Sequence, residues 1–286
     1  EIIISDDYST DETYDIAKRI INSYHGVHKI ILNRNKHNLG LAAHTNKVVR
    51  MANSDLIILA GGDDISMPER SKKSWDILNE NIDSTCVSFS SVKFKDQLYP
   101  KITAKSEVVP IIKYSIEELI SDCNFHISGA ARTFRKSVFE IFGPLRPDTP
   151  TEDSTILLRC LLAGSVLKYD KPLIYHRIHG NNVYASKNRY FIDYEKIHYQ
   201  YMIDLQRALE IGLIDDGTFM RVKNSLENKL QRRIIWSKFY REDEKFKNFL
   251  LSILFSRVFS RKEKERYFRK VYLNSRAKVA RILHLR

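Results

Sequence analysis

The sequence predicts an α/β fold in which a mostly parallel sheet is flanked by helices and followed by a C-terminal helical region. Short apolar segments that are typical of buried strands alternate with amphipathic segments that are typical of helices. Adjacent acidic residues lie at or shortly after the ends of two of these strand segments, and the strand pattern is absent from the last hundred residues. The alternation predicts right-handed βαβ units, whose parallel strands place ligand-binding residues at one edge of the sheet.

Composition is that of an ordinary globular protein. The 286 residues include three widely spaced cysteines, Cys86, Cys123 and Cys160, which indicate neither a disulfide framework nor a zinc site and favour a reducing cytosol. No apolar run reaches the ~20 residues of a membrane-spanning helix, and no signal peptide opens the chain. We therefore expect a soluble or peripheral protein in the cytoplasm, with the inner face of the plasma membrane as an alternative location.

The net charge of +12 is unevenly distributed. Residues 1–186 carry 23 basic and 23 acidic side chains, whereas residues 187–286 carry 24 and 12. This asymmetry predicts a domain boundary near residue 187, between a first domain at 1–186 and a basic helical region at 187–286.

The first predicted strand starts at Glu1 and ends at the acidic pair Asp6-Asp7. A turn with Ser, Thr and Asp as possible caps leads into a helix through Ile16 and Ile21. A second strand at 29–32 is followed by a polar loop at 33–40 and then by another helix. Because Glu1 lies inside a strand, we expect that it is not the natural start and that a preceding strand is missing.

The third predicted strand, Leu56 to Leu59, is the centre of the pattern. It stops at Gly61 and Gly62, which allow a sharp turn, and is followed by Asp63 and Asp64. Two adjacent carboxylates at the carboxyl end of a strand suit a hard divalent cation, Mn²⁺ or Mg²⁺. The alternative is a solvated acidic turn without a ligand.

The remaining elements of the first domain follow in order. We expect a helix at 70–78, a strand at 85–94, a loop at 96–113 and a strand at 125–134 beside the site. A proline-containing loop at 142–151 then delivers Glu152-Asp153 to the start of a helix at 155–164. Glu152 and Asp153 are either functional acids or ordinary acids that stabilise a helix N-terminus.

The C-terminal region is predicted to be helical at 190–211 and 219–240, with Gly212 between these helices. Its last segment, residues 245–286, has 13 basic and two acidic residues together with an apolar stripe. This basic segment, 245–286, is typical of a helix on an anionic membrane surface, and the alternative is that its stripe packs on the protein.

Five motifs in a fixed order resemble those of the inverting family 2 glycosyltransferases, which have the Rossmann-like GT-A fold. They are Asp6-Asp7-x-Ser9-x-Asp11, Asn38-x-Gly40-Leu41 with Asn46, Gly62-Asp63-Asp64 with Pro68, Glu152-Asp153 with Leu158-Arg159 and Gly164, and Tyr175-x-Arg177-x-His179-x-Asn181-Asn182. The resemblance implies a hexosyltransferase that uses a nucleotide-diphosphate-sugar donor, with uridine favoured as the base and Mn²⁺ or Mg²⁺ on the diphosphate. The acceptor would be a saccharide or a lipid-linked saccharide in the synthesis of a bacterial-type surface polysaccharide.

The same resemblance implies roles for individual residues. Asp153 would be the catalytic base, with Glu152 orienting the acceptor, because an acceptor hydroxyl needs a carboxylate to take its proton. Asp63 and Asp64 would bind the metal, and His179 would bind either the metal or the diphosphate. The residues implied in donor binding are Asp6, Asp7, Asn38, Gly40, Asn46, Gly62, Asp63, Arg177 and His179. Single histidines such as His126 and His176 are more often structural, and Arg132 is either structural or an acceptor contact.

Two departures from the family pattern keep other functions open. The family usually opens with a strand that we do not expect to find after Glu1, and Gly61 stands where its metal motif commonly has an aspartate, which predicts weaker metal binding. The alternatives are an inactive or truncated relative that acts as a scaffold, and a sugar-nucleotide pyrophosphorylase. A nucleic-acid binder is disfavoured because the basic segment has no recognisable nucleic-acid module.

Overall fold

The computed structural model describes residues 1–95, 109–121, 127–179, 191–241, 253, 256–257 and 259–265. The chain forms two compact units, Glu1–Asn182 with Glu195–Ser225, and Val183–Tyr194 with Leu226–Arg286. The boundary predicted near residue 187 falls in the segment 183–194 of the second unit. None of the described helices combines the length and the apolar character needed to cross a membrane.

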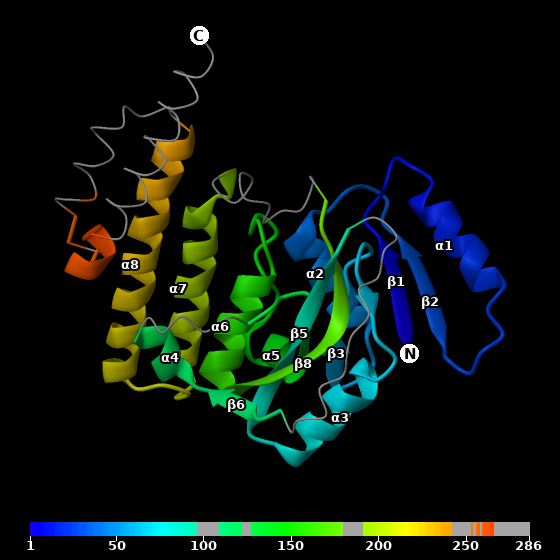
Figure 1. The fold of residues 1–286 in the computed structure, drawn as a ribbon, viewed down its shortest axis with the longest axis horizontal. Helices are drawn as coiled ribbons and strands as arrows, with labels where there is room; N and C mark the ends of the chain where they lie inside the picture. The colour runs from blue at the N-terminus through cyan, green and yellow to red at the C-terminus, as the bar shows by residue number, and fades with distance from the viewer. Residues whose placement is uncertain are drawn as a thin grey trace, which may run out of the picture. The chain divides into compact units, whose positions relative to one another are not determined.

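The first unit begins with two βα repeats (Figure 1). Strand β1 (Ile2–Asp6) is followed by α1 (Thr13–Asn22), and β2 (Ile30–Arg34) by α2 (Leu41–Met51). β1 and β2 are parallel, with Ile2 opposite Ile30. Both strands therefore end at the same edge, and the polar residues that follow them lie close together.

A second sheet has the strand order β3-β7-β5-β8-β4, with β6 also paired to β8. Its strands are β3 (Leu56–Ile58), β4 (Ile65–Ser66), β5 (Ser84–Phe94), β6 (Ile111–Tyr114), β7 (Arg132–Arg135) and β8 (Ser165–Arg177). The two long central strands, β5 and β8, are parallel, and the other pairs in this sheet are antiparallel. The sheet is thus mixed.

Helices cover both faces of β5. The remaining helices are α3 (Arg70–Glu80), α4 (Ile116–Ile120), α5 (Ser137–Phe142), α6 (Asp153–Ala163), α7 (Tyr194–Glu210) and α8 (Asp216–Arg241). Val87 of β5 packs with Ile77 and Leu78 of α3 in the main apolar cluster. The side chain of the preceding residue, Cys86, contacts Cys160 of α6. Because successive side chains of a strand point to opposite faces, α3 and α6 lie on opposite sides of the sheet (Figure 1).

The structure confirms the predicted alternation of strands and helices. It corrects the prediction of a mostly parallel sheet, because four of the five strand pairs described in the second sheet are antiparallel, and it corrects two elements. Residues 111–113, expected in a loop, belong to the edge strand β6, where Ile111 and Ile112 remain 42% and 43% exposed. Ile111 and Ile112 are consecutive apolar residues, so no alternation of apolar and polar residues marks this strand in the sequence. The strand expected at 125–134 is shorter, because β7 begins only at Arg132.

Several predictions fall outside the described residues. Residues 96–108 of the expected loop and 125–126 of the expected strand are among them, as are Asn181 and Asn182 of the last motif. Of the basic segment 245–286, the structure describes only residues 253, 256–257 and 259–265, so its predicted membrane-surface helix stays a prediction.

Candidate functional site

The turn between β3 and β4 holds two aspartates in different environments. The side chain of Asp63 is 40% exposed, and its Oδ2 lies 2.9 Å from Nε2 of His179, two residues after the end of β8. The side chain of Asp64 is 7% exposed. Only Asp63 therefore presents a partly open carboxylate, and the fold brings together Asp63 and His179, as the motifs implied.

Asp64 is held by the end of β8. Its Oδ1 accepts a hydrogen bond from the backbone N–H of Arg177 at 3.0 Å and lies 3.1 Å from Nδ1 of His176. These contacts fasten the turn to the last residues of β8. His176, which sequence reasoning treated as a structural group, thus supports the acid pair directly. The signal available in the sequence was its place one residue before Arg177.

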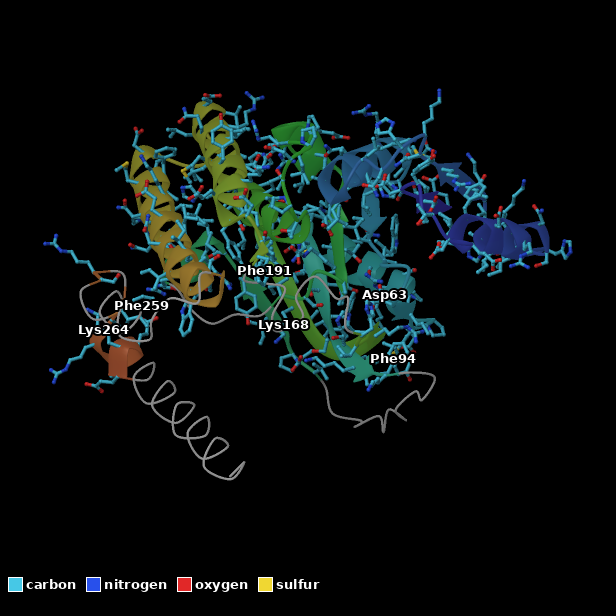
Figure 2. All side chains as sticks on the ribbon, turned by 90° about the horizontal axis from the view of Figure 1, so that it is seen from above. Asp63, Phe94, Lys168, Phe191, Phe259 and Lys264 are labelled. Atoms are coloured by element: carbon cyan, nitrogen blue, oxygen red, sulfur yellow. The ribbon has the colours of Figure 1, made fainter. Side chains whose placement is uncertain are left out.

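The side chain of Arg177 holds the same turn at Asp63. Its Nε donates to the backbone oxygen of Asp63 at 3.1 Å, and its guanidinium lies 4.5 Å from the ring centroid of Phe94. Asp63 and Phe94, which both contact Arg177, are labelled in Figure 2. Gly61 leaves room for the acid, because a Cβ there would lie 2.7 Å from Oδ1 of Asp63. At Gly62 a Cβ would meet no neighbouring atom within 4 Å.

A buried arginine lies beneath this turn. Arg70, 1% exposed at the start of α3, donates to the backbone oxygens of Leu59 at 2.8 Å, Ala130 at 3.0 Å and Arg132 at 3.2 Å. Burial lowers its pKa to about 10, and the nearby charge of Asp64 opposes that shift. Arg70 thus ties the end of β3 to the start of β7. Sequence reasoning missed it, because its partners are carbonyl groups as far as 62 residues away.

The second acid pair lies at the start of α6. Asp153 is packed against Gly129, where a Cβ would come within 2.8 Å of its Cβ and Oδ2. The buried guanidinium of Arg132 donates to the backbone oxygen of Asp153. Burial raises the pKa of Glu152, and the neighbouring charge of Asp153 raises it further. Arg132 therefore has a structural contact that holds the helix start against β7.

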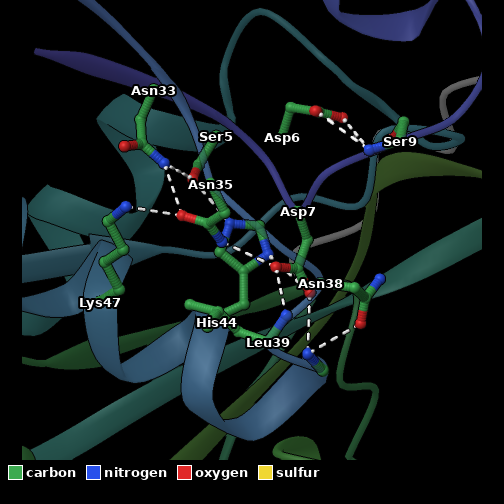
Figure 3. A network of polar contacts seen from close by, with 11 residues as sticks. Ser5, Asp6, Asp7, Ser9, Asn33, Asn35, Asn38, Leu39, His44 and Lys47 are labelled. Carbon is green, nitrogen blue, oxygen red and sulfur yellow. Dashed lines mark hydrogen bonds and ion pairs between the residues drawn. The ribbon is translucent and has the colours of Figure 1, made fainter.

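The residues after β1 and β2 form a polar network (Figure 3). Oδ1 of Asp7 accepts from Nδ2 of Asn35 at 2.7 Å and from the backbone N–H of Leu39 at 2.8 Å. Oδ2 accepts from the backbone N–H of Gly40 at 2.9 Å. Gly40 has a positive φ of 78°, which favours glycine. Asp7 therefore organises the loop that opens α2.

Other members of this network are also engaged within the chain. Asp6 is 7% exposed and accepts from the backbone N–H of Ser9 at 3.1 and 3.3 Å. Oδ1 of Asn38 accepts from Gly40 N–H at 3.1 Å. Nε2 of His44 lies 2.6 Å from the Ser5 hydroxyl. The acids and amides expected to contact a nucleoside thus also shape their own loops.

Asn46 has a clearly structural position. Its Nδ2 donates to the backbone oxygen of Leu145 at 2.7 Å, and its Oδ1 accepts from the backbone N–H of Leu145 at 2.8 Å. The side-chain amide of Asn46 thereby makes two hydrogen bonds with the backbone of Leu145, 99 positions away, and attaches α2 to the loop before α6.

A divalent cation fits the Asp63–His179 pair in its donor chemistry. A carboxylate oxygen and an imidazole nitrogen both suit Mn²⁺, whereas Mg²⁺ favours oxygen donors. No group of three or more His, Cys, Asp or Glu side chains gathers into a metal cage within the part of the chain that the structure describes. The pair could therefore supply only part of a coordination sphere, and ligand oxygens would have to supply the rest.

The chain is similar to known glycosyltransferases in sequence and in fold. Residues 1–142, just under half of the chain, match the model of the family described as Glycosyl transferase family 2. An uncharacterized glycosyltransferase of Methanocaldococcus jannaschii is 28% identical over 156 residues, which cover 44% of this chain and 53% of that protein. EpsE of Bacillus subtilis, described as a glycosyltransferase, is 40% identical over 81 residues, 28% of each chain. The matched residues thus span about half of the length of the first of these curated relatives and about a quarter of the second.

Solved structures show the same fold at low sequence identity. S. aureus TarS 1–349 in complex with UDP-GlcNAc matches with a TM-score of 0.59 and 14% identity, over 88% of this chain and 69% of that chain. The mannosyltransferase PcManGT from Pyrobaculum calidifontis, in complex with GDP-Man and Mn²⁺, matches with a TM-score of 0.54 and 13% identity, over 96% and 70%. The predicted GT-A fold, with a central sheet flanked by helices, is confirmed.

Proposed function

Because residues 1–142 match glycosyl transferase family 2, we propose that this chain transfers a sugar from a nucleotide-diphosphate donor to an acceptor hydroxyl. The observation that carries the proposal is the partly exposed carboxylate of Asp63, held beside His179 at the turn after β3. A carboxylate at this edge of an α/β sheet stands where phosphate-containing ligands of such sheets collect.

The donor we propose is a UDP-sugar, with a GDP-sugar as the alternative. Structural neighbours are described in complex with UDP-GlcNAc, with UDP, and with GDP-Man and Mn²⁺. In this chain Asp63 and His179 would hold Mn²⁺ or Mg²⁺, and the cation would offset the negative charge of the diphosphate. Asp64 would act indirectly, because its carboxylate is buried against His176 and the Arg177 backbone.

The transfer step needs a base on the acceptor side. In the proposed mechanism Asp153 accepts the proton of the acceptor hydroxyl, whose oxygen then attacks the anomeric carbon of the sugar. The bond from that carbon to the diphosphate oxygen breaks, and its electron pair leaves with the diphosphate. A single displacement inverts the anomeric configuration. Glu152, whose pKa is raised by burial and by Asp153, would orient the acceptor hydroxyl.

The acceptor we propose is a saccharide or a lipid-linked saccharide of a surface polysaccharide, and the transferred sugar a hexose. A lipid-linked acceptor would place the enzyme at the inner face of the plasma membrane. The basic segment 245–286, with 13 basic against two acidic residues, supports that location by its charge.

The proposed function is tested with Asp153→Asn. This variant keeps the shape of the side chain and removes its charge, so the transfer rate should fall about 10²–10⁴-fold while the affinity for UDP with Mn²⁺ stays near that of the unmodified chain. Turnover is measured with UDP- and GDP-sugars, and affinity by calorimetry.

A matched control is Asp148→Asn, which removes a carboxylate from the preceding loop, where Asp148 pairs with Arg146 at 3.1 Å. This control should retain full turnover. An Asp153→Asn enzyme with most of its turnover would refute the base assignment. An unmodified chain that binds UDP and Mn²⁺ but transfers no sugar would support the scaffold alternative.

A further inference from the structure

We propose that the ring of Tyr8 stacks on the nucleobase of the donor, an inference that rests on the proposed function. Tyr8 directly follows the acidic pair Asp6-Asp7 at the end of β1. Among the described residues it is the only one other than glycine with a positive φ, 65°. Strained backbone of this kind clusters at ligand-binding sites, where the surrounding structure maintains it.

Burial of the ring does not account for the strain. The left-handed conformation brings Cβ close to the following carbonyl, so glycine or asparagine is the usual residue there. A tyrosine offsets this cost when its ring buries apolar area, yet Tyr8 is 48% exposed. The turn therefore carries an exposed aromatic ring where a smaller residue would be more stable.

One neighbour of the ring is a fixed cation. The guanidinium carbon of Arg34 lies 5.7 Å from the Tyr8 ring centroid and 4.9 Å from that of Tyr14. Nη2 of Arg34 donates to the backbone oxygen of Ser9 at 3.1 Å, and its Nε lies 3.5 Å from Oδ2 of Asp6. These contacts orient Arg34, whose guanidinium supports the ring of Tyr8. Tyr8 itself remains 48% exposed to solvent.

The acids beside Tyr8 make the aromatic ring more important for binding. Asp7 accepts hydrogen bonds from Asn35, Leu39 and Gly40, and Asp6 accepts from Ser9 (Figure 3). Because the oxygens of these carboxylates already accept hydrogen bonds within the chain, they can accept fewer hydrogen bonds from a nucleobase. A planar ring supplies affinity by stacking instead, and stacking accepts either uracil or guanine because every base has a π-face.

The experiment uses the full chain and three variants of one residue. Tyr8→Gly removes both the ring and the strain, Tyr8→Asn removes the ring and tolerates the left-handed backbone, and Tyr8→Phe keeps the ring. Calorimetry measures the affinity for UDP, GDP and pyrophosphate, each with Mn²⁺, and a thermal melt checks the fold.

We expect the Gly and Asn variants to bind UDP and GDP about tenfold or more weakly, with unchanged pyrophosphate affinity. Tyr8→Phe should bind like the unmodified chain, and Tyr8→Gly should melt at the same or a higher temperature. Unchanged UDP affinity in the Gly and Asn variants, or an equal loss for pyrophosphate, would overturn the role of Tyr8 alone. An unmodified chain that binds neither UDP nor GDP would overturn the proposed function and this inference together.

Discussion

Asp63 and Asp64 carry the same charge next to each other, but only one of them is available to a ligand. The 40% exposure of the Asp63 side chain against 7% for Asp64 follows from the contacts of β8, which enclose the second acid. A pair of acids after a strand predicts the location of a site, whereas the division of roles depends on residues more than 110 positions away.

We therefore predict different results from alanine at each position. Asp63→Ala should remove Mn²⁺-dependent UDP binding and leave the free energy of unfolding within ~0.5 kcal/mol, because the carboxylate is partly exposed. Asp64→Ala should lower the free energy of unfolding by about 1–3 kcal/mol, because the Arg177 N–H is left without its acceptor. Calorimetry and urea unfolding measure the two effects. Equal stability of both variants would contradict the assignment.

The raised pKa of Glu152 leads us to predict that the free energy of unfolding depends on pH. Its pKa is raised in the folded chain, first by burial and then by Asp153, so folding favours the protonated form. The stability that this provides is fully present below the unfolded pKa of about 4.3 and is lost as pH rises through the folded value. Glu152→Gln should thus be more stable than the unmodified chain at pH 8, with a smaller difference at pH 5.

Urea unfolding at the two pH values measures this difference. Asp148→Asn is the control of opposite sign, because the Arg146 side chain lowers the pKa of Asp148, whose contribution to stability is present at neutral pH and is lost on acidification. A gain from Glu152→Gln that does not grow with pH would show that another property of the variant is responsible.

At the scale of elements, α6 is locked to α7 by a fully buried ion pair. The guanidinium of Arg159 donates to both carboxylate oxygens of Asp204 at 2.8 Å, and both side chains are 0% exposed. Nε2 of Gln200 donates to Asp204 at 2.9 Å. Burial raises the pKa of Asp204, and Arg159 opposes the shift. The helix that carries Asp153 is thereby also held in place at Arg159, in its second half.

Removing either partner should leave an uncompensated buried charge. We expect Arg159→Ala and Asp204→Ala each to lower the free energy of unfolding by ~3–5 kcal/mol, and the double variant Arg159→Met, Asp204→Leu to recover much of that loss. The exposed pair Lys72 and Asp76 on α3, 2.8 Å apart, is the control and should contribute only ~0.3–0.5 kcal/mol. Urea unfolding would contradict the prediction if both pairs contributed equally.

Local signals explain how much of the architecture was predictable. Runs of apolar residues predicted β1, β3 and β5, and the start of α6 follows from the loop that precedes it. β6 has no such signal, because its residues are exposed at an edge and are fixed only by pairing with β8. The antiparallel pairing of β7 with β5 likewise depends on neighbours that no local pattern encodes. The role of Arg70 could not be predicted for the same reason, because it depends on hydrogen bonds to three carbonyl groups that are distant in the sequence.

At the scale of the whole molecule, the excess positive charge lies in residues 187–286, and the basic segment 245–286 has the highest density. If this segment binds an anionic membrane, replacing Arg261, Lys262 and Lys264 together with glutamine should weaken binding to phosphatidylserine vesicles about 100-fold, since each cation contributes ~1 kcal/mol.

Vesicle co-sedimentation measures this effect. Transfer to a soluble acceptor should be unchanged in the triple variant, and neutral vesicles should bind both proteins equally weakly. Unchanged affinity for the anionic vesicles would contradict the membrane prediction and favour packing of the segment on the protein.

The buried contact between Cys86 of β5 and Cys160 of α6 makes it possible to measure how often α6 separates from the sheet. Both thiols are 0% exposed, and burial raises the pKa of Cys86, so the reactive thiolate is scarce while the chain is folded. A thiol reagent can modify them only after α6 has separated from the sheet. The rate at which a dilute reagent modifies Cys86 and Cys160, measured separately from Cys123, therefore reports how often the helix that carries Asp153 detaches.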